Sequence, residues 1–211
     1  MKRKIKNSFS MQKETQVIIL IFVLGSCLGI FSKYLDFYQA SLPTLLHLFD
    51  QLFDFHNYLG TFGPWLMIAL IISIYAPSPR SAAYLVFTFF FGMVLSYYLY
   101  CYYICGFYSL SYIMIWACFT ILSPLLGYLC WFSLGKDILS FQISSLIMSV
   151  FFNLTFSYGC FYLDIKSWLN LLLLLIVLLM LHKGLKEDLL MIVLGMSIGI
   201  LSKSLLPIYF W

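Results

Sequence analysis

The stretch Ser81–Gly135, SAAYLVFTFFFGMVLSYYLYCYYICGFYSLSYIMIWACFTILSPLLGYLCWFSLG, contains no Asp, Glu, Lys or Arg. It is long enough for two transmembrane helices of about 20 residues each. The rest of the chain has the same character, with 63% hydrophobic and only 9% charged residues and a mean hydropathy of +0.98. Soluble domains contain only about 45–50% apolar residues. The sequence therefore predicts an integral membrane protein in the all-α class, a polytopic transmembrane helical bundle.

Apolar segments bounded by Gly, Pro or charged residues predict seven spans along the chain. The second and sixth are short, so a count of six remains open. The predicted spans are Val17–Leu35, Phe62–Ala76, Ala82–Cys105, Tyr108–Leu134, Leu139–Tyr158, Trp168–His182 and Leu189–Tyr209.

The basic residues predict the orientation of these spans, because Lys and Arg near short loops favour the cytoplasmic side. With the N-terminus inside, nine basic residues fall on the cytoplasmic side: Lys2, Arg3, Lys4, Lys6, Lys13, Arg80, Lys136, Lys183 and Lys186. Only Lys33, Lys166 and Lys203 fall outside. Seven spans then place the C-terminus outside, and we expect a multi-pass protein of the cell membrane.

The predicted organisation is a basic cytoplasmic tail, residues 1–14, followed by a single transmembrane helical domain, residues 15–211. Residues 36–60 form an outer loop in which Ser41-Leu42-Pro43 begins a short amphipathic helix. We expect its apolar face to lie in the membrane interface. An alternative for the N-terminal region is a lipoprotein, because Leu24-Gly25-Ser26-Cys27 loosely resembles a cleavage box that would make Cys27 a lipidated N-terminus.

The polar face of this short helix contains His47, Asp50, Gln51 and Asp54, with His56 nearby. His and carboxylate side chains at spacings of three and four can bind a divalent cation. Every interfacial helix also needs a polar face, and that explanation is the simpler one. We therefore predict no metal site here.

The first and last predicted spans share a motif, Gly-x-x-x-Gly-x-x-Ser-Lys, within a gap-free alignment of Val23–Leu35 with Val193–Leu205. Glycines four residues apart lie on one helix face and allow a second backbone to approach closely. The simple interpretation is helix packing through Gly25, Gly29, Gly195 and Gly199. A further hypothesis is that Lys33 and Lys203 hold an anion or a lipid headgroup, whereas the alternative is that both lysines only reach for the interface.

The fifth predicted span carries a polar stripe of Gln142, Ser145, Ser149, Asn153 and Ser157. At 100° per residue these side chains fall within about 120° of arc. Such a stripe faces other helices or a wet cavity, because exposure to lipid is costly. It is therefore either an interhelical hydrogen-bonding face or the lining of a substrate pathway.

Several residue patterns that carry chemistry are missing from the sequence. Asp and Glu occur only in loops and at helix ends, and no histidine lies at the centre of a predicted span. Ion-coupled carriers and intramembrane hydrolases usually need ionisable residues at that depth. We therefore expect no enzyme activity, no cofactor and no nucleic-acid partner.

The repeated glycine motif and Gly63-Pro64-Trp65 resemble features of small, uncharacterised multi-pass membrane proteins from low-GC bacteria. The chain is also loosely similar, in size and hydrophobicity, to the membrane-embedded substrate-binding subunits of vitamin transporters, which typically have six spans. The first resemblance implies no particular activity. The second implies binding of a small molecule together with a partner ATPase.

Two functional hypotheses follow from these observations. The first is a transport-related protein, passive or dependent on a partner ATPase, for a polar or anionic small molecule or a lipid headgroup. The alternative is a non-transporting assembly or immunity-type subunit that binds another membrane protein through its transmembrane helices. In either case the first partner is the lipid bilayer, and the sequence leaves the substrate, the partner and the oligomeric state open.

Overall fold

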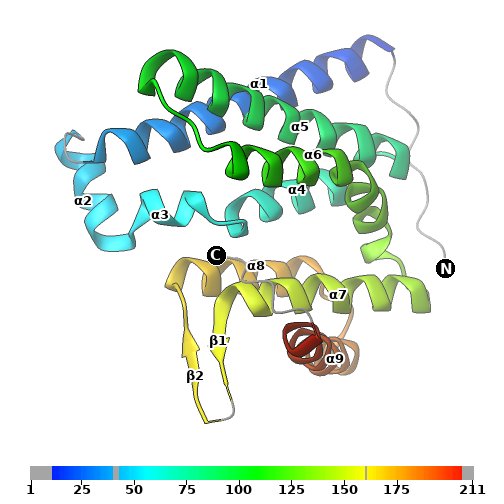
Figure 1. Cartoon of the computed structure of the whole chain (residues 1–211). Helices are drawn as coiled ribbons and strands as arrows, with labels where there is room; N and C mark the ends of the chain where they lie inside the picture. The colour runs from blue at the N-terminus through cyan, green and yellow to red at the C-terminus, as the bar shows by residue number, and fades with distance from the viewer. Residues whose placement is uncertain (1–10, 40–42, 160, 206–211) are drawn as a thin grey trace. The chain divides into compact units, whose positions relative to one another are not determined.

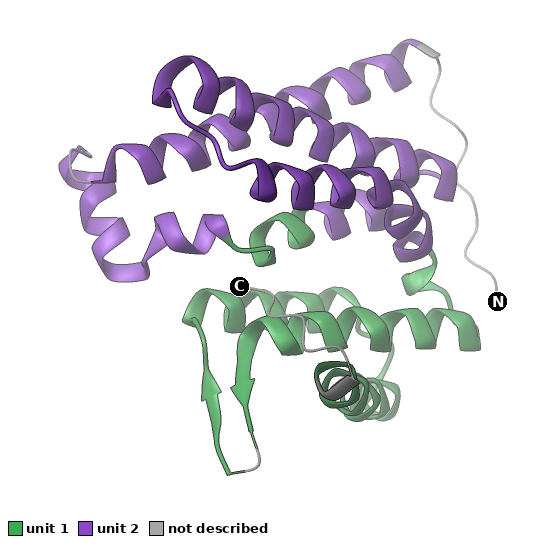
Figure 2. Cartoon of the chain, in the orientation of Figure 1, with its two compact units in different colours: residues 1–4, 61–68, 132–211 green, residues 5–60, 69–131 purple. Residues whose placement is uncertain are grey.

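The computed structural model describes residues 11–39, 43–159 and 161–205 (Figure 1). The chain divides into two compact units (Figure 2). Among the described residues, unit 1 contains Thr61–Ile68 and the chain from Phe132 onward, and unit 2 contains the chain from residue 11 to Gly60 together with Ala69–Trp131. Most of the predicted basic tail, residues 1–14, lies outside the described residues, which begin at residue 11.

Unit 2 is a set of helices packed around α5. Its elements are α1 (Met11–Phe37), α2 (Thr44–Phe53), α3 (Phe55–Gly60), the second half of α4 (Gly63–Tyr75), α5 (Pro79–Tyr100), a π-helical turn (Cys101–Cys105) and α6 (Leu110–Cys130). Both α1 and α6 lie against α5 (Figure 1). The start of α5 is fixed by Ser78, whose hydroxyl accepts the Ser81 N–H at 3.1 Å, and by Pro79 in the first turn.

Helix α6 continues through Pro124, where a backbone hydrogen bond must be missing. Proline has no N–H, so the carbonyl of Thr120 loses its usual donor four residues later. The Ser123 hydroxyl donates to that carbonyl at 2.8 Å. A neighbouring serine thus satisfies the freed carbonyl, which a membrane helix needs because lipid cannot do so.

Unit 1 is organised around α7 (Ile138–Thr155), against which α8 (Trp168–Met180) and α9 (Leu185–Leu205) both pack. It also contains the first half of α4 and a 3₁₀ turn that ends at Leu134. Between α7 and α8 the chain forms a hairpin of two short antiparallel strands, β1 (Phe156–Tyr158) and β2 (Leu163–Ile165) (Figure 1).

The hairpin corrects the predicted end of the fifth span, which we had extended to Tyr158. The helix ends at Thr155, and Ser157 lies on β1 opposite Asp164. The strand pairing continues beyond the hairpin, because the Lys166 N–H donates to the Thr155 carbonyl at 2.8 Å. Aromatic and β-branched residues around Ser157 favour this extended pairing over another helical turn.

Within the described residues, four helical segments are long and apolar enough to cross a membrane: Gln12–Phe37, Pro79–Cys105, Leu110–Leu134 and Ile138–Thr155. Two shorter apolar helices, α4 and α8, occupy the second and sixth predicted spans. The described residues therefore support an all-helical membrane protein with several long apolar helices, in agreement with the fold class predicted from the sequence.

The predicted amphipathic helix corresponds to α2, which begins after Pro43, while Ser41 and Leu42 lie outside the described residues. The helix ends at Phe53, the next residue, Asp54, has a left-handed φ of 50°, and α3 follows directly. The apolar side chains of Leu45, Leu48 and Leu52 are exposed, whereas Asp50 is buried. Exposed leucines are what an interfacial helix presents to lipid.

Candidate functional site

The first glycine motif lies in a close contact between α1 and α5 within unit 2. A Cβ atom added at Gly25 would fall 3.1 Å from the Phe89 carbonyl carbon and 3.2 Å from the Met93 nitrogen. One added at Gly29 would fall 3.1 Å from the Met93 carbonyl carbon. The contacts advance in the same direction along both helices, so α1 and α5 run parallel. No side chain larger than hydrogen fits at either glycine unless the backbones separate.

Serine hydroxyls join the two helices at the same contact. Ser96 on α5 donates to the Ser26 carbonyl on α1 at 2.9 Å. Ser26 in turn donates to the Gly92 carbonyl on α5 at 3.4 Å. Interhelical hydrogen bonds of this kind contribute about 0.6 kcal/mol each in membrane proteins. The glycine motif in α1 is therefore used for packing inside the chain.

The second glycine motif makes an equivalent contact between α9 and α7 within unit 1. A Cβ atom added at Gly195 would lie 2.8 Å from the Met148 Cβ and 3.1 Å from the Ser145 carbonyl oxygen. One added at Gly199 would lie 3.2 Å from the Phe152 ring and 3.4 Å from the Asn153 side-chain oxygen. These contacts also advance in the same direction, so α7 and α9 are a second parallel pair.

The polar stripe of α7 belongs largely to this contact. Ser145 and Ser149 are buried and donate to carbonyls of their own helix, those of Phe141 at 3.0 Å and Leu146 at 2.8 Å. Asn153 donates across to the Gly199 carbonyl at 3.2 Å and to Ser202 at 3.3 Å. Three stripe residues therefore face the glycine helix, which favours the packing interpretation of the stripe.

The other two stripe residues lie elsewhere. Gln142 is exposed, and Ser157 is on the hairpin. Next to Ser157, the Tyr158 hydroxyl donates to Asn153 Oδ1 at 2.6 Å and contacts the Gly199 carbonyl at 3.0 Å. The structure thus adds Tyr158 to the network, a residue that the sequence analysis did not single out.

The two lysines of the repeated motif have different surroundings. Lys33 is buried, with Nζ 2.5 Å from Asp36 Oδ2 and 5.6 Å from the centre of the Tyr97 ring. Lys203 is exposed, donates to the Tyr158 carbonyl at 2.9 Å and lies 4.1 Å from the centre of the Tyr158 ring. A carboxylate therefore neutralises Lys33, whereas Lys203 donates to a neutral carbonyl.

A polar pocket of about 550 Å³ lies where α2 meets α3, wholly within unit 2. Six polar side chains line it: Gln39, His47, Asp50, Gln51, Asp54 and His56. Gln39 was absent from the sequence prediction, because it precedes the helix that carries most of the others. The pocket thus gathers the face that we had weighed as a cation site.

The His56–Asp50 pair forms the buried wall of the pocket. The His56 Nδ1 lies 2.9 Å from both Asp50 oxygens, and the His56 backbone N–H donates to Asp50 Oδ1 at 2.8 Å. Burial alone would raise the pKa of Asp50, but the hydrogen bonds from the His56 backbone and ring lower it below its ordinary value. Asp50 is therefore ionised at neutral pH.

Asp54 is the exposed carboxylate of the pocket and accepts from Asn57 Nδ2 at 2.8 Å. Its carboxylate also lies 3.5 Å from His56 Nδ1. In the part of the chain that the structure describes, no group of three or more His, Cys, Asp or Glu side chains is placed to hold a metal ion. The pocket is instead suited to a molecule that can donate and accept hydrogen bonds.

No protein-family model, curated protein or solved structure matches this chain.

Proposed function

We propose that this chain is a transport-related membrane protein with seven spans that receives a polar small molecule in the pocket between α2 and α3. The observation that carries this proposal is an open pocket of about 550 Å³ whose six lining residues all have polar side chains, in a chain that is 63% hydrophobic. The Asp50 and Asp54 carboxylates favour a neutral or cationic molecule with N–H or O–H donors over an anion. The proposed protein is not an enzyme and is passive or depends on a partner ATPase.

The parallel helix pairs support the seven-span topology. If α1 and α5 both cross the membrane in the same direction, the chain between them must return, and α4 is the apolar helix available for that crossing. The same argument assigns α8 to the return between α7 and α9. Helices of 13 residues are about 20 Å long, so the bilayer must thin locally around them or flanking residues must complete the crossing.

Topology can be tested with single-cysteine variants of the chain, labelled in intact cells with a membrane-impermeant maleimide. We expect labelling at Gln51 and Tyr162 positions, which lie in the predicted outer segments, and protection at Arg80 and Lys136 positions. Labelling on the same side for positions that flank α4, or for positions that flank α8, would remove that helix from the list of spans.

The pocket can be tested by thermal unfolding of the detergent-purified protein in the presence of polar amines, amides and sugars. We expect at least one of these compounds to raise the Tm of the natural protein, and Asp54→Asn to reduce that shift. Asparagine tolerates the left-handed backbone at this position, so the variant removes charge with little strain. Asp164→Asn on the hairpin is the matched control and should leave the shift unchanged. A panel with no effect on the natural protein would contradict the pocket proposal.

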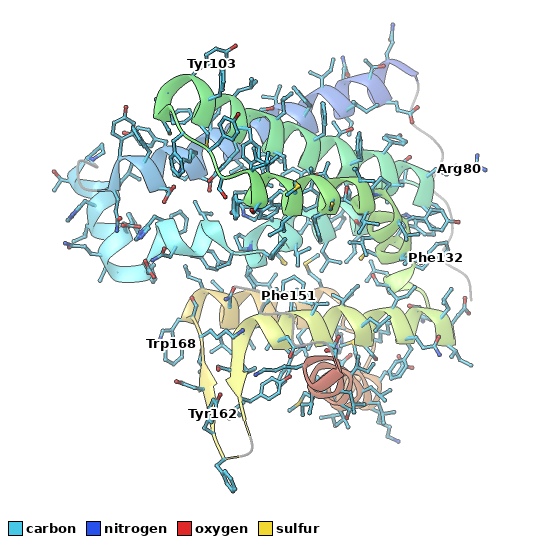
Figure 3. The ribbon with its side chains drawn as sticks, viewed as in Figure 1. Arg80, Tyr103, Phe132, Phe151, Tyr162 and Trp168 are labelled. Carbon is cyan, nitrogen blue, oxygen red and sulfur yellow. The ribbon has the colours of Figure 1, made fainter. Side chains whose placement is uncertain are left out.

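The alternative is an assembly or immunity-type subunit, and one observation favours it. Aromatic side chains beyond the end of α5 are strongly exposed, including Tyr102, Phe107 and Tyr103, the last of which extends from the ribbon in Figure 3. The glycine faces, by contrast, are already filled within each unit. If native mass spectrometry of nanodisc-extracted protein retains another membrane protein and Tyr103→Ser releases it, the assembly function is favoured. Retention of a small molecule or an ATPase favours transport.

A further inference from the structure

Two lysines converge where the hairpin, α7 and α9 meet in unit 1. The Lys166 Nζ donates to the Asn153 carbonyl at 2.9 Å, and the Lys203 Nζ donates to the Tyr158 carbonyl at 2.9 Å. Asn153 and Tyr158 are themselves joined by the 2.6 Å hydrogen bond between their side chains. Both ammonium groups are therefore fixed to the same short piece of backbone.

This pair of cations has no carboxylate partner among the described residues, which include every Asp and Glu of the sequence. The nearest carboxylate along the chain, that of Asp164, accepts the N–H of its own neighbour Ile165 at 2.8 Å. Two effects lower the pKa of Lys166: the larger is the partial desolvation of its ammonium group, and the smaller is repulsion from Lys203. Two cations held close together without a carboxylate attract an anion.

The contrast with Lys33 shows that the motif alone does not create this situation. Lys33 occupies the same place in the first glycine motif as Lys203 does in the second, yet it is buried and paired with Asp36. Lys203 instead has Lys166 beside it and is exposed to an incoming group. An anion could approach the second site without displacing a carboxylate.

The hairpin beside the two lysines exposes apolar and aromatic side chains. Phe161 is fully exposed, and Tyr162, Leu163 and Trp168 are each more than half exposed. Figure 3 shows Tyr162 on the hairpin and Trp168 where the chain enters α8. Trp and Tyr next to Lys are typical of the zone where acyl chains meet headgroups. A free inorganic anion would gain no binding energy from these apolar side chains, whereas the acyl chains of a lipid would contact them.

We propose that Lys166 and Lys203 together bind the phosphodiester group of an anionic phospholipid, whose acyl chains contact the aromatic side chains of the hairpin. The two ammonium groups donate hydrogen bonds to the non-bridging phosphate oxygens. Asn153 and Tyr158 hold the lysines in place through their carbonyls. The site is independent of the α2–α3 pocket, so failure of one proposal leaves the other standing.

The test is native mass spectrometry of the delipidated protein titrated with phosphatidylglycerol or with phosphatidylcholine. We expect phosphatidylglycerol to bind more tightly, and Lys166→Gln/Lys203→Gln to weaken its binding roughly tenfold, equivalent to about 1.4 kcal/mol. Lys136→Gln/Lys186→Gln removes the same charge from exposed positions elsewhere and should retain the affinity. Equal losses in the two double variants, or no loss in the first, would overturn the proposal.

Three further measurements separate the effect of charge from that of folding, separate a lipid from a free anion, and test the site in the natural protein. The Lys166→Arg/Lys203→Arg variant should retain binding. Excess inorganic phosphate should leave the phosphatidylglycerol adduct in place, and its displacement would reject a lipid in favour of a free-anion site. Acetylation of the natural protein in nanodiscs needs no variant. Lys166 and Lys203 should be protected by phosphatidylglycerol but not by phosphatidylcholine, and equal labelling in both lipids would contradict the site.

Discussion

The indole N–H of Trp131, at the end of α6, donates to the carbonyl of Ala76 at 2.9 Å. Ala76 immediately follows α4, so its carbonyl is one of those that a helix end leaves without an intrahelical donor. Trp131 is only 2% exposed. This bond therefore satisfies a buried carbonyl and joins the ends of two helices within unit 2.

Replacing Trp131 with Phe should lower the free energy of unfolding in detergent by about 2–4 kcal/mol, since it leaves the Ala76 carbonyl unsatisfied and opens space in a packed region. Denaturant unfolding followed by circular dichroism measures this change. Trp168→Phe provides the control, because that indole is 73% exposed and its loss should change stability by less than about 0.5 kcal/mol. Similar losses for both variants would contradict the role of the Trp131 bond.

Adding a single methyl group at Gly25 should destabilise unit 2. The new Cβ would collide with the α5 backbone at Phe89, where no flexible side chain can move aside. We expect Gly25→Ala to cost about 1–3 kcal/mol. Gly60→Ala is the matched variant, because its Cβ would meet nothing within 4 Å, and we expect it to be neutral or slightly stabilising. A neutral Gly25→Ala would mean that α1 and α5 do not pack this closely.

Asn153 and Tyr158 should behave as a coupled pair. Their side chains bond to each other and both contact the Gly199 carbonyl. Asn153→Ala and Tyr158→Phe should each destabilise the protein, and the double variant should cost less than the sum of the two by about 0.5–1 kcal/mol. A double-mutant cycle from thermal or denaturant unfolding gives this number. Gln142→Ala, an exposed position on the same helix, should show additivity with Tyr158→Phe.

The pH dependence of stability should report on Asp50. Hydrogen bonds from His56 outweigh burial and lower the pKa of Asp50 in the folded protein, so the folded state favours its charged form. Its contribution is complete above the unfolded carboxyl pKa of about 4 and is lost as pH falls through the lower folded value. Asp50→Asn should therefore lower Tm at pH 7 and reduce the fall in Tm between about pH 5 and pH 2. If the Tm of Asp50→Asn falls with pH in parallel with the Tm of the natural protein, this assignment is refuted.

Local patterns were enough to predict most of the helices. Apolar length and the bounding Gly, Pro and charged residues located segments such as α5 and α6, because a span must satisfy its own backbone and bury no charge. The predicted end of α7 was wrong, because the residues that follow Thr155 are apolar enough to have continued a membrane helix. Their extended conformation depends on pairing with β2, which lies several residues further along the chain.

The candidate sites depended more strongly on tertiary contacts. The glycine motif indicated close packing, but its partners, Phe89 on α5 and Met148 on α7, carry no sequence feature that identifies them. Lys203 was singled out from its repeat with Lys33. Its structural neighbour is Lys166, which contributes from a hairpin that the sequence analysis read as part of a helix and a loop. The spacing of residues therefore predicted which side chains share a helix face, but it did not predict which other helix that face packs against.

The two parallel helix pairs use the glycine motif in opposite chain order: α1 precedes its partner α5, whereas α9 follows its partner α7. During synthesis α7 therefore emerges before α9, so the Asn153 amide N–H groups at first lack their Gly199 and Ser202 acceptors, whereas Ser145 and Ser149 already donate to carbonyls of their own helix. Until α9 is added, lipid headgroups or the insertion machinery must supply acceptors for the Asn153 amide, since hydrocarbon cannot. The α7–α9 contact of unit 1 can therefore form only after α9 has been synthesised, later than the α1–α5 contact of unit 2.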